Sequence, residues 1–93
     1  MIETLGAGWV RFSFEHAVDS PVFLVGDFNG WDKQATPMKK MNDGSFTVTI
    51  TLQKGKKYQY RYLLDGTVWE NDWKADAYVP TQIGSGDNSV VQV

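Results

Sequence analysis

Apolar and polar residues alternate along several stretches of the chain, and no stretch keeps a helical period over three turns. In VRFSFE, which begins at Val10, every second residue is apolar. The same alternation recurs in FTVTITL (46–52) and in YQYRYLL (58–64). A period of two is that of a half-buried strand, so each stretch is predicted to be a strand with one face against a core.

The alternation also assigns residues to faces. In YQYRYLL it predicts that Tyr58, Tyr60, Tyr62 and Leu64 point inward and that Gln59, Arg61 and Leu63 point outward. PVFLVG (21–26) is apolar on both faces, which is typical of a more central strand. DNSVVQV (87–93) predicts a last short strand.

Turn signals separate these stretches. They are Asn42-Asp43-Gly44, Lys54-Gly55-Lys56 and Asp65-Gly66, and each predicts a hairpin. About seven short strands with such punctuation indicate an all-β fold, an immunoglobulin-like β-sandwich. The 93 residues, 42% of them hydrophobic, suit one domain over residues 1–93. The segment 70–86 is long for a loop, and we expect it to pack across one end or face of the sandwich.

Composition excludes several classes of partner. The net charge is -2 and the sequence pI is about 5.1, so we expect no nucleic-acid partner. Lys54, Lys56 and Lys57 are interpreted as a solvated hairpin tip. There is no cysteine, hence no disulfide and no thiolate metal site. The N-terminal stretch has neither a basic leader nor a long apolar run, which favours a soluble, cytoplasmic protein without a membrane partner.

Catalytic chemistry has little support in the sequence. His16 is the one histidine and has no cysteine to pair with, so a nucleophilic triad is not favoured. The carboxylates that could form a glycosidase pair are those of Asp65, Glu70, Asp72 and Asp76, but a small sandwich offers little room for a water-excluding cleft. We therefore predict that the chain is not an enzyme.

The turn GDFNGWD (26–32) carries oxygen ligands but lacks the order of a calcium loop. Asp27, Asn29 and Asp32 are interpreted as turn residues, and no cofactor or metal is expected. Trp31 either folds back under this turn or stays at the surface to be covered by a ligand. The chain has 4 tryptophans, and some of its aromatic residues are expected in the core. Sugar rings have apolar C–H faces, so a tryptophan that stays at the surface suits carbohydrate stacking.

Taken in order, VFLVGDFNGWD, a DG turn, YQYRYLLDG, a tryptophan, ADAYVP and NSVVQV resemble a known family. The pattern is similar to the glycogen-binding modules of carbohydrate-binding module family 48, the isoamylase N-terminal, early-set type. The resemblance covers residues 10–93. It implies an immunoglobulin-like sandwich that binds α-1,4-linked glucan, a glycogen, starch or maltooligosaccharide chain, without catalysis.

The resemblance also implies a set of sugar-contacting residues. The two platform tryptophans of the family fall on Trp31 and Trp69, and its cationic residue falls on Arg61. The apolar, hydroxyl and amide residues near the last strand fall on Ile83, Ser85 and Asn88.

Two alternatives stay open at this point. Trp73, where many relatives have proline, could add a third platform, close over Trp69, or plug the long segment into the sandwich. The same aromatic surface could instead serve protein interaction, either with a second copy of the chain or with a glucan-active enzyme.

Overall fold

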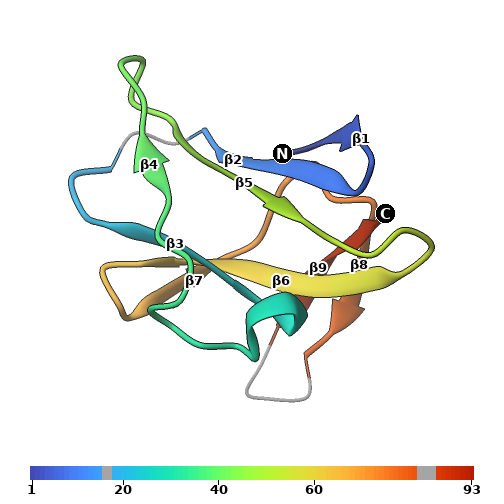
Figure 1. Ribbon diagram of the computed structural model, residues 1–93. Coiled ribbons are helices and arrows are strands. Elements are labelled where there is room, and N and C mark those ends of the chain that lie inside the picture. The colour runs from blue at the N-terminus through green and yellow to red at the C-terminus, as the bar shows by residue number, and fades with distance from the viewer. Residues whose placement is uncertain (16–17, 82–85) are drawn as a thin grey trace.

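The computed structural model describes residues 1–15, 18–81 and 86–93 (Figure 1). Within these residues the chain forms nine strands and one short 3-10 helix, η1 (Asp27–Asn29). The strands are β1 (Ile2–Gly6), β2 (Trp9–Phe14), β3 (Val22–Gly26), β4 (Lys39–Lys40), β5 (Phe46–Thr51), β6 (Lys57–Leu64), β7 (Val68–Glu70), β8 (Ala77–Pro80) and β9 (Asp87–Gln92). His16, Ile83 and Ser85 lie outside the described residues.

The strands form two antiparallel sheets stacked as a sandwich (Figure 1). One sheet has the order β1-β2-β5-β4, and the other has the order β3-β6-β9-β8, with β7 also paired to β6. β3 lies on one side of β6, whereas β7 and β9 pair with different halves of its other side. The all-β prediction is confirmed.

The core between the sheets is rich in aromatic rings. Phe12 from β2 meets Tyr60 from β6 edge to face, with 5.0 Å between ring centroids, and Phe14 lies 5.2 Å from Tyr62. Each of these four residues is at most 5% exposed. The inward faces predicted from the alternation of β2 and β6 are therefore confirmed.

The hairpin predicted at Asp65-Gly66 is also confirmed. Asp65 and Gly66 have φ of 52° and 71°, and the N–H of Thr67 donates to Leu64 O at 3.1 Å. Two central residues with positive φ are the mark of a type I′ turn, whose twist suits a tight hairpin. The turn returns the chain along β6 and sets Trp69 directly opposite Leu63.

The hairpin predicted at Lys54-Gly55-Lys56 is wrong. β5 belongs to the four-stranded sheet and β6 to the other sheet, so this turn carries the chain from one layer to the other. Gly55 N–H donates to Val93 O at 2.8 Å instead of closing a hairpin. A turn dipeptide specifies that the chain bends, but it does not specify which strand the chain pairs with afterwards.

The hairpin predicted at Asn42-Asp43-Gly44 is confirmed, since β4 pairs with β5 across this turn. The strand count was predicted too low, because β1 and β8 were missed. Most residues of β1 and β8 are exposed, so neither gives a clean apolar alternation. β8 lies within the segment 70–86 that was expected to be a loop, and it pairs with β9 along four residues. This segment therefore extends the five-stranded sheet by a strand.

Candidate functional site

The outward face of the five-stranded sheet carries a second apolar layer. Tyr60 and Tyr62 belong to the central core, so Leu63 points to the other side of β6. Leu63 and Val25 are nevertheless 0% exposed, and neither belongs to the central core cluster. Trp69 is the cross-strand neighbour of Leu63. This face is thus built to support large rings above a layer of buried aliphatic side chains.

The turn that follows β3 places Trp31 at this face. Asn29 ties the turn to β3, because its Oδ1 accepts from Gly26 N–H at 3.1 Å and its Nδ2 donates to Leu24 O at 2.9 Å. Gly30 and Trp31 both have left-handed backbones, with φ of 66° and 58°. A positive φ is uncommon for a residue as bulky as tryptophan, so the turn holds Trp31 in an orientation that it would rarely adopt alone.

The indoles of Trp31 and Trp69 meet at this face. Their ring centroids lie 6.4 Å apart with 58° between the ring planes, and both side chains are half-buried. The Nζ of Lys33 lies 5.9 Å from the centroid of Trp69, within cation–π range. The two rings therefore form an angled aromatic surface rather than a flat one.

Polar side chains from β6 and β9 also belong to this face. Ser89 opposes Tyr60, so Asn88 follows in the register beside Arg61. Asn88 is 4% exposed and donates through Nδ2 to Gln59 Oε1 at 3.0 Å. In the described part of the chain, its Oδ1 and the Nε of Arg61 are buried without a hydrogen-bond partner. Unpaired buried polar atoms are costly, so a hydrogen bond gained by either atom would be stabilising. Both atoms are closed off from solvent, so a ligand hydroxyl could reach them only after a small side-chain shift.

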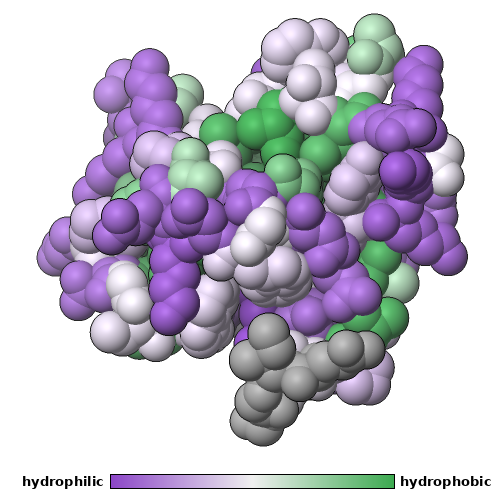
Figure 2. Space-filling model, turned by 60° about the horizontal axis from the view of Figure 1, so that its bottom comes forward, coloured by the Kyte–Doolittle hydropathy of each residue, from purple (hydrophilic) through white to green (hydrophobic). Residues whose placement is uncertain are grey.

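The Arg61 side chain is also confined by Gly86, the residue that precedes β9. A Cβ added to Gly86 would lie 2.9 Å from Arg61 Nη2, so the guanidinium lies against this glycine. Figure 2 turns the lower side of the molecule forward and shows that hydrophilic and pale residues are interspersed there. Four of the residues predicted to contact sugar, Trp31, Arg61, Trp69 and Asn88, thus come from strands and a turn of one sheet.

Trp73 lies apart from this group. It is 75% exposed and lines a cavity of about 250 Å³ together with Met1, Phe14 and Tyr62. A side chain with that exposure does not fill the interior, and its place beside Phe14 and Tyr62 puts it at the gap between the sheets. Ile83 and Ser85 fall outside the described residues, so their predicted contacts stay predictions.

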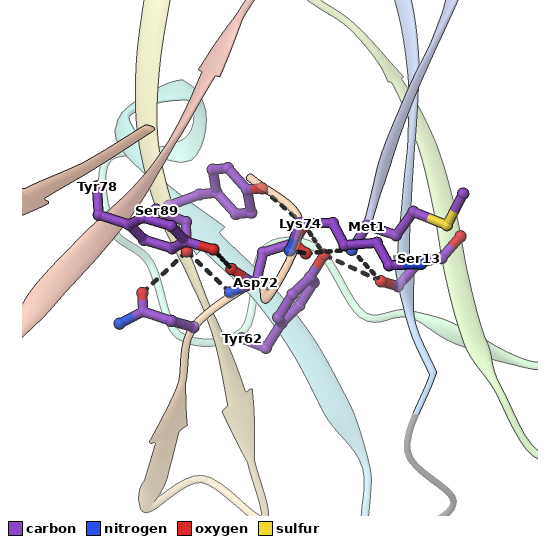
Figure 3. Close-up of polar contacts among 9 residues, drawn as sticks. Met1, Ser13, Tyr62, Asp72, Lys74, Tyr78 and Ser89 are labelled. Carbon is purple, nitrogen blue, oxygen red and sulfur yellow. Dashed lines mark hydrogen bonds and ion pairs between the residues drawn. The ribbon is translucent and has the colours of Figure 1, made fainter. Parts of the chain in front are cut away.

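A polar network around Asp72 was not foreseen (Figure 3). Asp72 is 2% exposed, and its Oδ2 accepts from the hydroxyls of Tyr60 at 2.7 Å and Tyr62 at 3.0 Å. Its Oδ1 accepts from Lys74 N–H at 3.0 Å and pairs with the terminal ammonium of Met1. Burial, together with neighbouring negative charge, raises the pKa of both tyrosines well above the ordinary value. The two hydroxyls therefore remain protonated donors.

The Asp72 network joins segments distant in sequence. Asp72 N–H donates to Ser89 Oγ at 2.8 Å, and the Tyr78 hydroxyl donates to Asp72 O. Asp72 had been considered as one member of a glycosidase pair. Its oxygens are engaged by the core tyrosines instead, so its observed contacts are those of a structural residue.

The turn carboxylates and amide of GDFNGWD are likewise engaged. Asp32 Oδ1 accepts from Gln34 N–H at 2.9 Å, Asn29 caps β3 as described, and Asp27 accepts from Trp31 and Gln59. Their interpretation as turn residues is confirmed.

Across residues 1–15, 18–81 and 86–93, no three His, Cys, Asp or Glu side chains are grouped to hold a metal ion. The same residues contain no helix long and apolar enough to span a membrane.

Comparison with known proteins identifies the family of the chain. The family model of carbohydrate-binding module 48, the isoamylase N-terminal domain, matches residues 7–79. The chain belongs to this family. The family match confirms the resemblance stated from the motifs, and it makes the chain a carbohydrate-binding module by membership.

Two relatives are 1,4-alpha-glucan branching enzymes, both named GlgB. The enzyme of Aquifex aeolicus (strain VF5) is 50% identical over an alignment of 63 residues, and the match covers 64% of this chain and 10% of the enzyme. The enzyme of Halothermothrix orenii (strain H 168 / OCM 544 / DSM 9562) is 30% identical over 76 residues, 82% of this chain and 12% of the enzyme. The chain thus matches only about a tenth of the length of either relative.

Proposed function

We propose that the outward face of the five-stranded sheet binds α-1,4-linked glucan, such as glycogen, starch or a maltooligosaccharide, without catalysing its reaction. The observation that carries the proposal is the angled pair of Trp31 and Trp69 beside the unpaired polar atoms of Arg61 and Asn88. The family match and the α-glucan named in both relatives support the choice of ligand.

The angle between the rings fits a curved ligand. α-1,4 linkages bend a glucan chain, so the apolar faces of successive glucose units point in different directions. Two platforms 58° out of parallel can each meet one such face, whereas a straight β-linked chain would suit coplanar rings. The arrangement of the two indoles, together with family membership, therefore supports this choice of ligand class.

The polar atoms give the ligand its orientation. After a small side-chain shift that exposes these two buried atoms, Asn88 Oδ1 accepts from a sugar hydroxyl and Arg61 Nε donates to one. Ile83 and Ser85 complete the proposed contacts by resemblance to the family. Trp73 is left out of the proposed face because it lies at the gap between the sheets.

Expected affinity follows from area. Stacking that buries about 100 Å² of apolar surface gives about 2.5 kcal/mol per platform at ~25 cal/mol/Å². Association itself costs at least several kcal/mol, so dissociation constants from roughly micromolar to millimolar are expected for a short oligosaccharide. Repeating polymers bind more tightly through multivalency.

Co-sedimentation with insoluble amylose tests the proposal. The wild type is expected in the pellet, whereas Trp31→Ala and Trp69→Ala are expected in the supernatant because each loses one platform. Trp9→Ala is the matched control, since Trp9 is 49% exposed but begins β2 in the other sheet. Circular dichroism verifies that all variants are folded.

Two outcomes would contradict the proposal. Full retention of Trp31→Ala and Trp69→Ala would remove the rings from the site. Failure of the wild type to bind, combined with a mass that rises with concentration in light scattering, would favour the alternative in which this aromatic surface mediates self-association.

A further inference from the structure

We propose that Asp27 is a positioning residue for the Trp31 platform, an inference that rests on the proposed glucan-binding function. Asp27 Oδ1 accepts from the indole Nε1–H of Trp31 at 2.9 Å, and Asp27 Oδ2 accepts from Gln59 N–H at 2.8 Å. One carboxylate therefore joins the platform ring to β6, the strand that carries Arg61.

The position of Asp27 follows from the end of β3. β3 pairs with β6 up to Gly26, which opposes Tyr60. Gln59, the residue before Tyr60 in β6, has no residue of β3 opposite it. Its N–H donates to the carboxylate of Asp27 instead of to a carbonyl of a neighbouring strand. The carboxylate thus continues the hydrogen-bond ladder by one step and keeps the turn close to β6.

The bond to the indole fixes which part of Trp31 is presented. The ring has one N–H donor, and Asp27 occupies it. A sugar can then use only the apolar face of Trp31, and a ring rotated to the opposite orientation would lose this bond. Charged acceptors make stronger hydrogen bonds than neutral ones, so a carboxylate suits this task.

Gln59 extends the same connection to Asn88. Its N–H is held by Asp27, and its side-chain Oε1 accepts from Asn88 Nδ2 at 3.0 Å. Because Asn88 donates toward Gln59, its Oδ1 is the atom left for a ligand. The hydrogen-bonded series Trp31, Asp27, Gln59, Asn88 therefore sets a platform and a polar contact relative to each other.

The test uses Asp27→Ala, Asp27→Asn and, as a matched control, Asp32→Ala. Asp32 lies in the same turn, but its carboxylate bonds Gln34 N–H and not the indole. Binding of maltoheptaose is measured by titration calorimetry, and the indole N–H of Trp31 is followed by proton–nitrogen NMR, assigned through its absence in Trp31→Phe. Urea unfolding reports stability separately.

We expect Asp27→Ala to weaken maltoheptaose binding about tenfold, the effect of losing roughly one hydrogen bond to a charged group. Its Trp31 indole N–H should shift and exchange faster with solvent. Asp27→Asn keeps an acceptor oxygen but loses the charge, so its affinity for maltoheptaose should lie between those of the wild type and Asp27→Ala. Asp32→Ala should bind as the wild type does.

Two results would overturn the inference. An unchanged indole N–H signal in Asp27→Ala would show that the bond does not hold the ring. A changed signal with wild-type affinity would show that the bond has no bearing on the ligand. A wild type that binds no maltoheptaose would contradict the proposed function itself, and the NMR comparison would still decide whether Asp27 orients Trp31.

Discussion

The carboxylate of Asp72 is buried where the two sheets meet segment 70–76, and it is surrounded by donors. An isolated charge in such a place is costly, but here two tyrosine hydroxyls and a backbone N–H are directed at it. Removing the acceptor would leave Tyr60 and Tyr62 as buried hydroxyls without partners. Substitution of Asp72 therefore tests how much this network contributes to the stability of the fold.

Asp72→Ala is expected to lower the free energy of unfolding by about 3 kcal/mol, within the range for disrupting a buried charged network. Urea denaturation followed by tryptophan fluorescence measures this loss. Asp19→Ala, at an exposed position, is the control and should change stability by less than about 0.5 kcal/mol. Equal stability of the two variants would show that the network does not stabilise the fold.

Also at the residue scale, the sequence pointed to some residues of the proposed site and not to others. Trp31, Trp69, Arg61 and Asn88 could be named because each occupies a recognisable place in an ordered motif series. Asp27 could not be singled out, since its bond to Gln59 joins residues 32 apart, and a turn carboxylate looks the same in sequence whether or not it meets a distant strand. Contacts of this kind require the register of β3 and β6.

Among the elements, the junction of β3 and η1 is closely packed. Gly26 has an extended backbone, with φ of -173°, so its need for glycine is one of space. An added Cβ would lie 2.5 Å from Gln59 O and 2.9 Å from the side chains of Phe28 and Tyr60. By contrast, Gly30 has φ of 66° and open space around its Cα. The two glycines of one turn are thus required for different physical reasons.

Gly26→Ala should therefore destabilise more than Gly30→Ala. The first forces β3 away from β6 and is expected to cost about 2 to 3 kcal/mol, as overpacking does. The second only places an alanine in the left-handed region, at about 1 kcal/mol. Thermal unfolding of both variants beside the wild type gives the order, and the reverse order would contradict the close approach at Gly26.

The prediction of elements succeeded where alternation was strong. β2, β5 and β6 were found because each buries one regular face, and the turn at Asp65-Gly66 was found because its dipeptide demands positive φ. Leu63 was predicted to face outward, which is correct, but its complete burial was not foreseen. Alternation predicts which face of the strand a side chain lies on. It does not predict whether another segment of the chain covers that face.

For the molecule as a whole, the raised pKa values of Tyr60 and Tyr62 couple folding to alkaline pH. Both groups stay protonated when folded, whereas in the unfolded chain they ionise with a pKa of about 10. Above that pH the folded state binds more protons than the unfolded state, so stability falls as pH rises. Below about pH 9 this contribution is fully present.

The expected result is a free energy of unfolding that declines steadily from about pH 10 upward. In Tyr60→Phe and Tyr62→Phe the decline should be less steep, because each variant removes one group that ionises only on unfolding. Urea unfolding over a series of alkaline buffers measures the slopes. Identical slopes in the variants and the wild type would show that these two tyrosines do not couple folding to pH.

Strand β6 places Tyr60 and Tyr62 in the core and Arg61 and Leu63 on the opposite face. A slip of one residue in its pairing would turn every side chain over, burying a guanidinium and sending two tyrosine rings into solvent. Molecules with this register error would thus lose both the core packing and the proposed glucan-binding face. Under the proposed function, an amylose column would retain correctly folded molecules and not those with the shifted register. Retention on the column would therefore measure how much of a refolded sample has the native strand pairing.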